Sequence, residues 1–349
     1  MKIENREIGG KGRTFIIAEI SANHNHSIEV AKTMIREAKK AGADAVKLQT
    51  YTADTITLDC DNEYFRIKQG TIWDGITFYE LYQKAYTPWE WHEELIKVAK
   101  EENIICFSSP FDKTAVDFLE KLEVPAYKVA SFEITDLSLI EYMAKTGKPI
   151  IISTGIATMQ EIQDAVNVCK EVGNNDIVLL KCTSAYPAKM EDMNLNTIPN
   201  MAETFGVISG LSDHTLGITV PIGAVALGAA VIEKHFILDR DMGGPDSAFS
   251  LNIEEFTQMV KAIRCIEKAL GKVEYTLSDK ALKNREFSRS LFIVKDIKQG
   301  EIFTEDNVQS IRPGYGLKPK YLKDILGKIC NRNLEKGTPM SWSYLKEGE

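Results

Sequence analysis

Short apolar runs alternate with helical segments between residues 14 and 270, and this alternation limits the fold more than any other feature. Runs rich in β-branched residues are typical of buried strands, and apolar residues at helical spacing follow most of them. Eight runs are predicted to be strands: Thr14–Ile20, Asp44–Thr50, Ile104–Phe107, Ala126–Ala130, Pro149–Ile152, Asp176–Leu180, Val207–Leu211 and Ala230–Ile232. An amphipathic helix over Ile253–Leu270 closes the series. Eight strand–helix units in about 260 residues predict a (β/α)8 TIM barrel, an α/β fold.

The texture of the chain changes after Gly271. Residues 273–284 are charged and lack a core pattern, which is typical of a linker. Residues 285–349 show short strands, glycine turns and one short helical segment near Lys320–Leu326. A segment of about 65 residues is near the lower limit for independent stability, so we expect it to dock on something larger. The sequence therefore predicts a barrel domain at 1–272, a linker at 273–284 and a small C-terminal domain at 285–349.

Composition and charge exclude several classes of partner. The net charge of −8 argues against nucleic acid and anionic membranes as bulk partners, and leaves room for a local basic site that binds a small anion. No apolar run approaches the ~20 residues of a membrane helix, and the first residues hold no apolar signal segment. Six cysteines show no CxxC pairing, which favours reduced thiols over a disulfide framework or a zinc site. We therefore expect a cytoplasmic protein.

Polar residues gather in the second half of the predicted strands or directly after them. They are Glu19, Lys47, Gln49, Ser109, Lys128, Ser131, Glu133, Ser153, Lys181, Tyr186, His214 and His235. The active site of a TIM barrel forms at the carboxyl ends of its strands, so we expect these side chains to meet at one mouth. Lys47 and Lys128 lie inside apolar runs, and lysine is seldom buried without a partner. Two such lysines near serines predict a pocket for an anionic ligand.

Two histidines, His214 and His235, end successive predicted strands. Neutral imidazole is a good ligand for divalent metal ions, so the two side chains could share one ion. A hydrogen-bonded structural pair is the alternative, and the residues alone leave both open. In the C-terminal segment, Arg312 of the RPGYG loop is a candidate for binding a carbonyl or carboxylate group. An arginine in a tight surface turn is an equally good interpretation.

Nine sequence blocks resemble the sialic acid synthase family in content and order. They are FIIAEISANHNHS, ADAVKLQTY, FSSPFD, AYKVASFE, PIIISTG, KCTSAYP, GLSDHT, EKHF and GPD. The C-terminal segment looks like the small antifreeze-protein-like (SAF) domain of that family, so the resemblance covers nearly the whole chain. It implies a transferase that joins phosphoenolpyruvate to an N-acetylated amino-sugar aldehyde and releases phosphate. It also implies a divalent metal cofactor, Mn²⁺ or Mg²⁺, and a domain-swapped homodimer in which each small domain covers the partner's barrel.

The resemblance also implies roles for individual residues. Those matched to the phosphate and carboxylate of phosphoenolpyruvate are Lys47, Lys128, Ser109, Ser131, Ser153 and Ser212. The metal ligands would be His214 and His235, which count among the catalytic residues. The acid–base carboxylates would be Glu19 and Glu133. Residues matched to the sugar are Gln49, Tyr186 and Asp246, with Arg312 of the partner subunit at the acetamido group.

Three departures from the usual pattern bear on which sugar is used. Ser184 stands where N-acetylneuraminate synthases usually carry asparagine, Phe132 replaces a usual glycine beside Glu133, and no histidine follows GPD. With Trp73-Asp74-Gly75 and the block TPWEWH, these features look like the pseudaminic acid synthase branch. The substrate of that branch is 2,4-diacetamido-2,4,6-trideoxy-L-altrose, whose missing hydroxyl makes an apolar wall such as Phe132 physically reasonable. Ser184 joins the expected substrate-binding residues.

Other functions remain open at this point. N-acetylneuraminate synthase and legionaminic acid synthase are the alternatives within the family. A non-catalytic barrel that binds a sugar or an anion is an alternative of another class, and the carboxylates argue against it because a sensor needs no acid–base groups. An ice-binding role for the C-terminal domain is disfavoured, since a segment fused to a barrel is better explained as a lid.

Overall fold

The structure, a computed structural model, describes residues 1–10, 12–68, 70 and 73–346. The chain divides into two compact units, Met1–Gly271 and Lys272–Glu349. The last three residues of the expected C-terminal domain lie outside the described part. The domain bounds predicted from the sequence stay a proposal. The expected linker contains a short helix, α11 (Asp279–Asn284), and none of the residues of this helix is buried.

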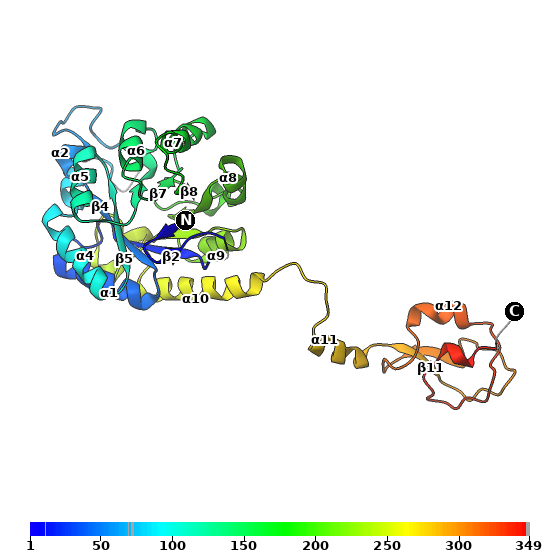
Figure 1. Cartoon of the computed structure of the whole chain (residues 1–349). Coiled ribbons are helices and arrows are strands. Elements are labelled where there is room, and N and C mark those ends of the chain that lie inside the picture. Colours follow the sequence, from blue (N-terminus) through cyan, green and yellow to red (C-terminus); the bar gives the residue numbers. More distant parts are fainter. Residues whose placement is uncertain (11, 69, 71–72, 347–349) are drawn as a thin grey trace. The chain divides into compact units, whose positions relative to one another are not determined.

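The first unit is a closed barrel of eight parallel strands, which confirms the predicted fold (Figure 1). The strands are β3 (Phe15–Glu19), β4 (Ala45–Thr50), β5 (Ile105–Pro110), β6 (Tyr127–Val129), β7 (Ile150–Ser153), β8 (Ile177–Cys182), β9 (Ile208–Asp213) and β10 (Val231–His235). They pair in chain order, and β10 closes the ring against β3. β9 and β10 extend past their predicted ends because the polar residues there still pair, Glu233 with Ser212 and Lys234 with Asp213.

Helices follow the strands and surround the barrel (Figure 1). They are α1 (Ile28–Ala41), α4 (His92–Glu101), α5 (Lys113–Lys121), α6 (Leu137–Ala144), α7 (Met159–Glu171), α8 (Thr197–Phe205), α9 (Thr219–Ala226) and α10 (Ile253–Leu270). Local sequence determines where several of them begin. Thr158 and Glu161 form the capping box that starts α7, and Asn252 with Glu255 does the same for α10. Two short helices, α2 (Ala53–Ile56) and α3 (Phe78–Ala85), lie in the long connection between β4 and α4.

Side chains alternate along each strand between the barrel interior and the surrounding helices. In β4, Ala45 belongs to the interior apolar cluster, whereas Val46 belongs to the outer cluster between strands and helices. The interior cluster also includes Ile3 and Ile8, which lie in and after an antiparallel hairpin of β1 (Lys2–Ile3) and β2 (Arg6–Glu7). Apolar residues therefore fill the amino end of the barrel, and the carboxyl end is left to polar side chains.

The second unit has a small core of its own. β11 (Ser290–Ile293) pairs antiparallel with β12 (Val308–Ile311), and α12 (Leu322–Ile325) forms within the helical segment predicted near Lys320–Leu326. The core cluster consists of Leu291, Ile293, Ile297, Phe303, Val308, Ile325, Cys330, Leu334 and Met340. In neither unit is a described helix long and apolar enough to cross a membrane.

Candidate active site

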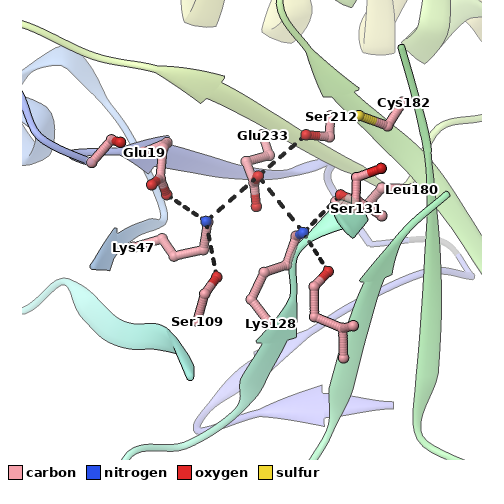
Figure 2. A network of polar contacts seen from close by, with 12 residues as sticks. Glu19, Lys47, Ser109, Lys128, Ser131, Leu180, Cys182, Ser212 and Glu233 are labelled. Atoms are coloured by element: carbon pink, nitrogen blue, oxygen red, sulfur yellow. Dashed lines mark hydrogen bonds and ion pairs between the residues drawn. The ribbon is translucent and has the colours of Figure 1, made fainter. Parts of the chain in front are cut away.

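A polar layer lies at the carboxyl ends of the barrel strands. The alternation that turns Ala45 inward also turns Lys47 inward two residues later, and the same rule holds on the neighbouring strands. The inward positions nearest the carboxyl ends carry Glu19, Lys47, Ser109, Lys128, Ser153, Cys182, Ser212, Glu233 and His235. Residues far apart in sequence therefore meet in one layer, and Figure 2 shows several of them converging.

Lys47 is almost fully buried and ion-paired. Its Nζ lies 2.7 Å from Oε2 of Glu19 and donates a hydrogen bond to Ser109 Oγ at 3.2 Å. Burial by itself lowers the pKa of a lysine, but Glu19 and Glu233 outweigh burial and raise the pKa of Lys47 above its ordinary value. Burial raises the pKa of Glu19 to about 7, although Lys47 opposes the shift. Lys47 is therefore charged at neutral pH, and Glu19 can exchange a proton there.

Lys128 is the second buried cation of the layer. Its Nζ donates hydrogen bonds to Ser153 Oγ at 2.7 Å and to the carbonyl oxygen of Val129 at 2.9 Å. Burial lowers the pKa of Lys128, and the carboxylate of Glu233 opposes that shift. Lys128 and Lys47 come from different strands, yet both reach Glu233. The predicted convergence of the two lysines is thus present in the structure, while their role as anion ligands stays a prediction.

Glu233 lies between the two buried lysines (Figure 2). Its Oε1 is 3.8 Å from Lys47 Nζ and 4.0 Å from Lys128 Nζ, and accepts a hydrogen bond from Ser212 Oγ at 3.2 Å. Burial alone raises the pKa of Glu233, but Lys128 and Lys47 outweigh it and bring the pKa below its ordinary value. The predicted site omitted Glu233. Its place two residues before His235, and therefore on the same face of the strand, is the signal that could have found it.

Two serines of the predicted site contact each other beside the lysines. Ser184 Oγ donates a hydrogen bond to Ser131 Oγ at 2.8 Å. Gly155 makes this approach possible, because a Cβ atom at that position would lie 2.3 Å from Ser184 Oγ and 2.7 Å from Ser131 Oγ. The glycine that follows β7 is therefore part of how the site is built.

The two histidines lie side by side, with ring centroids 5.3 Å apart. Nδ1 of His235 is buried without a hydrogen-bond partner in the described chain, and Oδ2 of Asp246 is 3.9 Å away. Burial lowers the pKa of His235 well below its ordinary value, which keeps the ring neutral, as metal binding requires. Nδ1 of His214 lies 3.2 Å from the carbonyl oxygen of Thr183. Burial lowers the pKa of His214, but Cys182 and that carbonyl outweigh burial and raise it, so metal binding at this ring would have to release a proton.

These two imidazoles fit a divalent ion that takes its other ligands from water or substrate. The described residues contain no group of three or more His, Cys, Asp or Glu side chains that could hold a metal ion. An unpartnered nitrogen on His235 beside a second imidazole is the observation in favour of the ion, because buried polar atoms are otherwise almost always hydrogen-bonded.

Glu133 ends a short 3-10 helix, Ser131–Glu133, that follows β6. Its Oε2 is buried and has no hydrogen-bond partner among the residues that the structure describes. Burial raises the pKa of Glu133 to about 7, and Lys128 opposes that shift. The neighbouring Phe132 is 58% exposed, which is unusual for a phenylalanine and leaves its ring free to contact a ligand.

Two of the residues matched to the sugar, Gln49 and Asp246, are linked through Ser21. Gln49 Nε2 donates hydrogen bonds to Glu19 Oε1 at 2.9 Å and to Ser21 Oγ at 3.0 Å, and Ser21 Oγ donates to Asp246 Oδ2 at 2.5 Å. Ser21 was not predicted, since its polar side chain in a loop carries no distinctive sequence signal. The ring of Tyr186 lies near His214, with centroids 4.4 Å apart. Arg312 is exposed just after β12 in the second unit, so its expected role stays a prediction.

The NeuB family model matches residues 34–275, and the SAF domain model matches residues 288–346. The chain is 52% identical to the pseudaminic acid synthase of Campylobacter jejuni over 95% of this chain and 96% of the relative. It is 37% identical to the N,N'-diacetyllegionaminic acid synthase of Legionella pneumophila over 98% of this chain and 99% of the relative.

Among solved structures, the N-acetylneuraminic acid (sialic acid) synthetase of Leptospira borgpetersenii is similar, with a TM-score of 0.73 and 31% identity. The match covers 82% of this chain and 95% of that one. The predicted resemblance is therefore confirmed by sequence and by fold. The chain belongs to the NeuB family and carries a C-terminal SAF domain.

Proposed function

We propose that this chain is a pseudaminic acid synthase. It condenses phosphoenolpyruvate with 2,4-diacetamido-2,4,6-trideoxy-L-altrose and water, and releases pseudaminic acid and phosphate. One observation carries the choice of product: identity to a pseudaminic acid synthase reaches 52%, against 37% for the legionaminic acid synthase of Legionella pneumophila. The buried lysines and the carboxyl groups with raised pKa support the chemistry.

The two lysines bind phosphoenolpyruvate. Its phosphate and carboxylate need positive charge and neutral donors in a buried place, and Lys47 and Lys128 supply the charge. The hydroxyls of Ser109 and Ser153 already contact these ammonium groups, so they lie where an anion held by the lysines can accept from them. Before the substrate binds, Glu19 and Glu233 are the carboxyl groups that contact these cations.

Glu19 and Glu133 transfer the protons. A bond forms between carbon 3 of phosphoenolpyruvate and the aldehyde carbon, and the aldehyde oxygen gains a proton. Water then adds at carbon 2 and loses one proton. When the bond from carbon 2 to the phosphate oxygen breaks, the new hydroxyl loses its remaining proton to the departing phosphate and carbon 2 becomes a ketone. The reaction needs one group that donates and one that accepts. With pKa values of about 7, Glu19 and Glu133 are each able to take either role near neutral pH.

His214 and His235 hold the divalent ion, Mn²⁺ or Mg²⁺. When bound, such an ion supplies Lewis-acid polarisation of the aldehyde oxygen. The unpartnered Nδ1 of His235 and the close approach of the two rings support this assignment. Asp246, 3.9 Å from that nitrogen, contacts the sugar together with Gln49 and Tyr186 in this proposal.

The assembly is a cytoplasmic homodimer in which each SAF domain covers the partner's barrel and brings Arg312 to the acetamido group. The SAF domain model matches residues 288–346, and Arg312 is exposed in that unit, so its guanidinium group is available to a partner. The six cysteines are free, which agrees with a reducing compartment.

Phosphate release, measured with the aldehyde substrates of the three synthases in turn, tests the proposal. We expect turnover with the altrose derivative and little with the others. A preference for a mannosamine-type sugar would move the assignment to N-acetylneuraminate synthesis. The variants Glu133→Ala and His235→Ala test the assigned residues, because unchanged phosphate release in both would show that the mechanism is wrong. No phosphate release by the native chain with any of the three sugars would favour the non-catalytic binding barrel instead.

A further inference from the structure

A second pair of charged residues lies directly behind the two histidines. Asp213 precedes His214, and Lys234 precedes His235, and the two are aligned as neighbours in the β9–β10 register. Alternation turns them away from the barrel interior. Their strand neighbours two residues earlier, Leu211 and Ile232, both belong to the outer apolar cluster. The pair therefore lies between the strands and the surrounding helices, outside the layer that contacts substrate in the proposed function.

The contacts of this pair tie the two strand ends together. Lys234 Nζ lies 2.6 Å from Asp213 Oδ2 and also donates to the carbonyl oxygen of Thr215. Asp213 Oδ1 in turn accepts from the backbone nitrogen of Thr215 at 3.0 Å and from its hydroxyl at 2.8 Å. His214 is the residue between Asp213 and Thr215, so its backbone is held on both sides. Lys234, the third residue in this set of contacts, directly precedes His235, so the same contacts also hold the backbone beside the second histidine.

An ion pair is an unexpected choice at this place. Both side chains are 0% exposed and lie in an apolar layer, where removing two charges from water opposes much of their mutual attraction. Well-packed apolar residues of similar volume commonly stabilise such a position as well or better. What an ion pair adds is a defined geometry, because the ammonium group and the carboxylate accept only certain positions of their partners.

We propose that the Asp213–Lys234 pair positions His214 and His235 and thereby determines the affinity of the site for a divalent ion. The inference rests on the metal site of the proposed function. Asp213 and Lys234 are positioning residues in this scheme, since they touch neither the ion nor the substrate. Partners that hold metal ligands from behind typically change metal affinity by about 10–100-fold when they are removed.

The test measures Mn²⁺ binding to the full chain without substrate, from the electron paramagnetic resonance signal of free Mn²⁺. We expect Lys234→Met to raise the dissociation constant of Mn²⁺ about tenfold. Because that variant leaves Asp213 buried without its cation, the double variant Asp213→Asn/Lys234→Met is measured beside it and is expected to show the same loss. Phosphoenolpyruvate affinity, measured by calorimetry, is expected to change less than about twofold, since Lys47 and Lys128 lie on other strands.

Arg264→Met is the matched control. Arg264 forms a partly buried ion pair with Asp44 at 2.9 Å, and Asp44 directly precedes the first residue of β4, at the amino end of the barrel. Its loss is expected to lower the melting temperature and leave Mn²⁺ affinity unchanged. Unchanged Mn²⁺ affinity in both variants of the Asp213–Lys234 pair, when both are folded, would overturn the inference. So would failure of both to fold while Arg264→Met folds, because the pair would then serve the whole barrel.

His235→Ala separates this inference from the proposed function. If that variant binds Mn²⁺ as tightly as the native chain, the metal site itself is wrong. If His235→Ala loses Mn²⁺ and the variants of the Asp213–Lys234 pair keep it, the metal site stands and only the positioning role fails.

Discussion

Glu233→Gln is the perturbation that most directly tests how the polar layer works. The substitution keeps the shape of the side chain and the acceptor for Ser212, and removes one negative charge from between two buried cations. Each charge pair at about 4 Å is worth about 4 kcal/mol at an effective dielectric constant near 20. Loss of one partner from a buried ion pair typically costs about 3–5 kcal/mol. For a barrel of this size, that loss lowers the melting temperature by about 5–15 °C.

The same substitution is expected to tighten the binding of phosphoenolpyruvate. In the native chain, the carboxylate of Glu233 and the bound anion compete for Lys47 and Lys128 and repel each other. The glutamine amide removes that competition, so part of the lost ion-pair energy returns when the substrate binds. Recovery of about 1.4 kcal/mol corresponds to a tenfold lower dissociation constant. The variant therefore becomes less stable alone and gains more stability from the substrate.

Differential scanning calorimetry with and without phosphoenolpyruvate, and isothermal titration of the same samples, measure both effects. Glu267→Gln is the control, because Glu267 also forms an ion pair, with Arg264 at 2.8 Å, but lies away from the polar layer. It is expected to lose stability without any change in substrate affinity. A weaker affinity for phosphoenolpyruvate in Glu233→Gln would refute the reasoning, since Glu233 would then help to bind the anion instead of competing with it.

Three further predictions follow from the site. Lys128→Met should weaken phosphoenolpyruvate binding about 10–100-fold by calorimetry, since a hydrogen bond to a charged group is worth about 1.5–3 kcal/mol. Lys181→Met is the control and should leave binding unchanged, because the ammonium group of Lys181 contacts Cys182 and Thr183 instead. Glu133 has a folded pKa of about 7 against an ordinary 4.5, so folding takes up a proton between these values and stability falls as the pH rises through that window. Glu133→Gln should therefore be more stable than the native chain by about 3 kcal/mol at pH 8 and equal to it at pH 4, by urea unfolding, and equal stability at both would contradict the raised pKa. Mixing inactive Arg312→Ala and His235→Ala chains in equal amounts should restore about one quarter of native phosphate release if the domains are exchanged. About half of the dimers are then mixed, and each mixed dimer contains one complete site out of two. No recovery after subunit exchange would exclude that arrangement.

Much of the fold was predictable because its signals are local. Eight apolar runs with helical segments between them lead to a closed parallel barrel by short-range pattern and general topology rules. The convergence of Lys47 and Lys128 was predictable for the same reason, since both follow inward-facing apolar residues at a spacing of two in their strands. Alternation alone decides which face of the strand a side chain takes. A lysine at an inward position can therefore be predicted without knowing which residue pairs with it.

The partners themselves depend on register, which a single sequence does not contain. Glu233 follows an apolar run just as Lys47 does, yet its importance comes from standing level with Ser212 and within 4.0 Å of two lysines on other strands. A shift of one residue would exchange Glu233 with Lys234, placing a third cation among the lysines and a carboxylate in the apolar layer. The Lys234–Asp213 pair opposes that shift, because it is satisfied in only one register. The outward ion pair and the inward charge balance therefore stabilise the same alignment of β9 and β10. This alignment also fixes the relative positions of the histidines at the ends of the two strands.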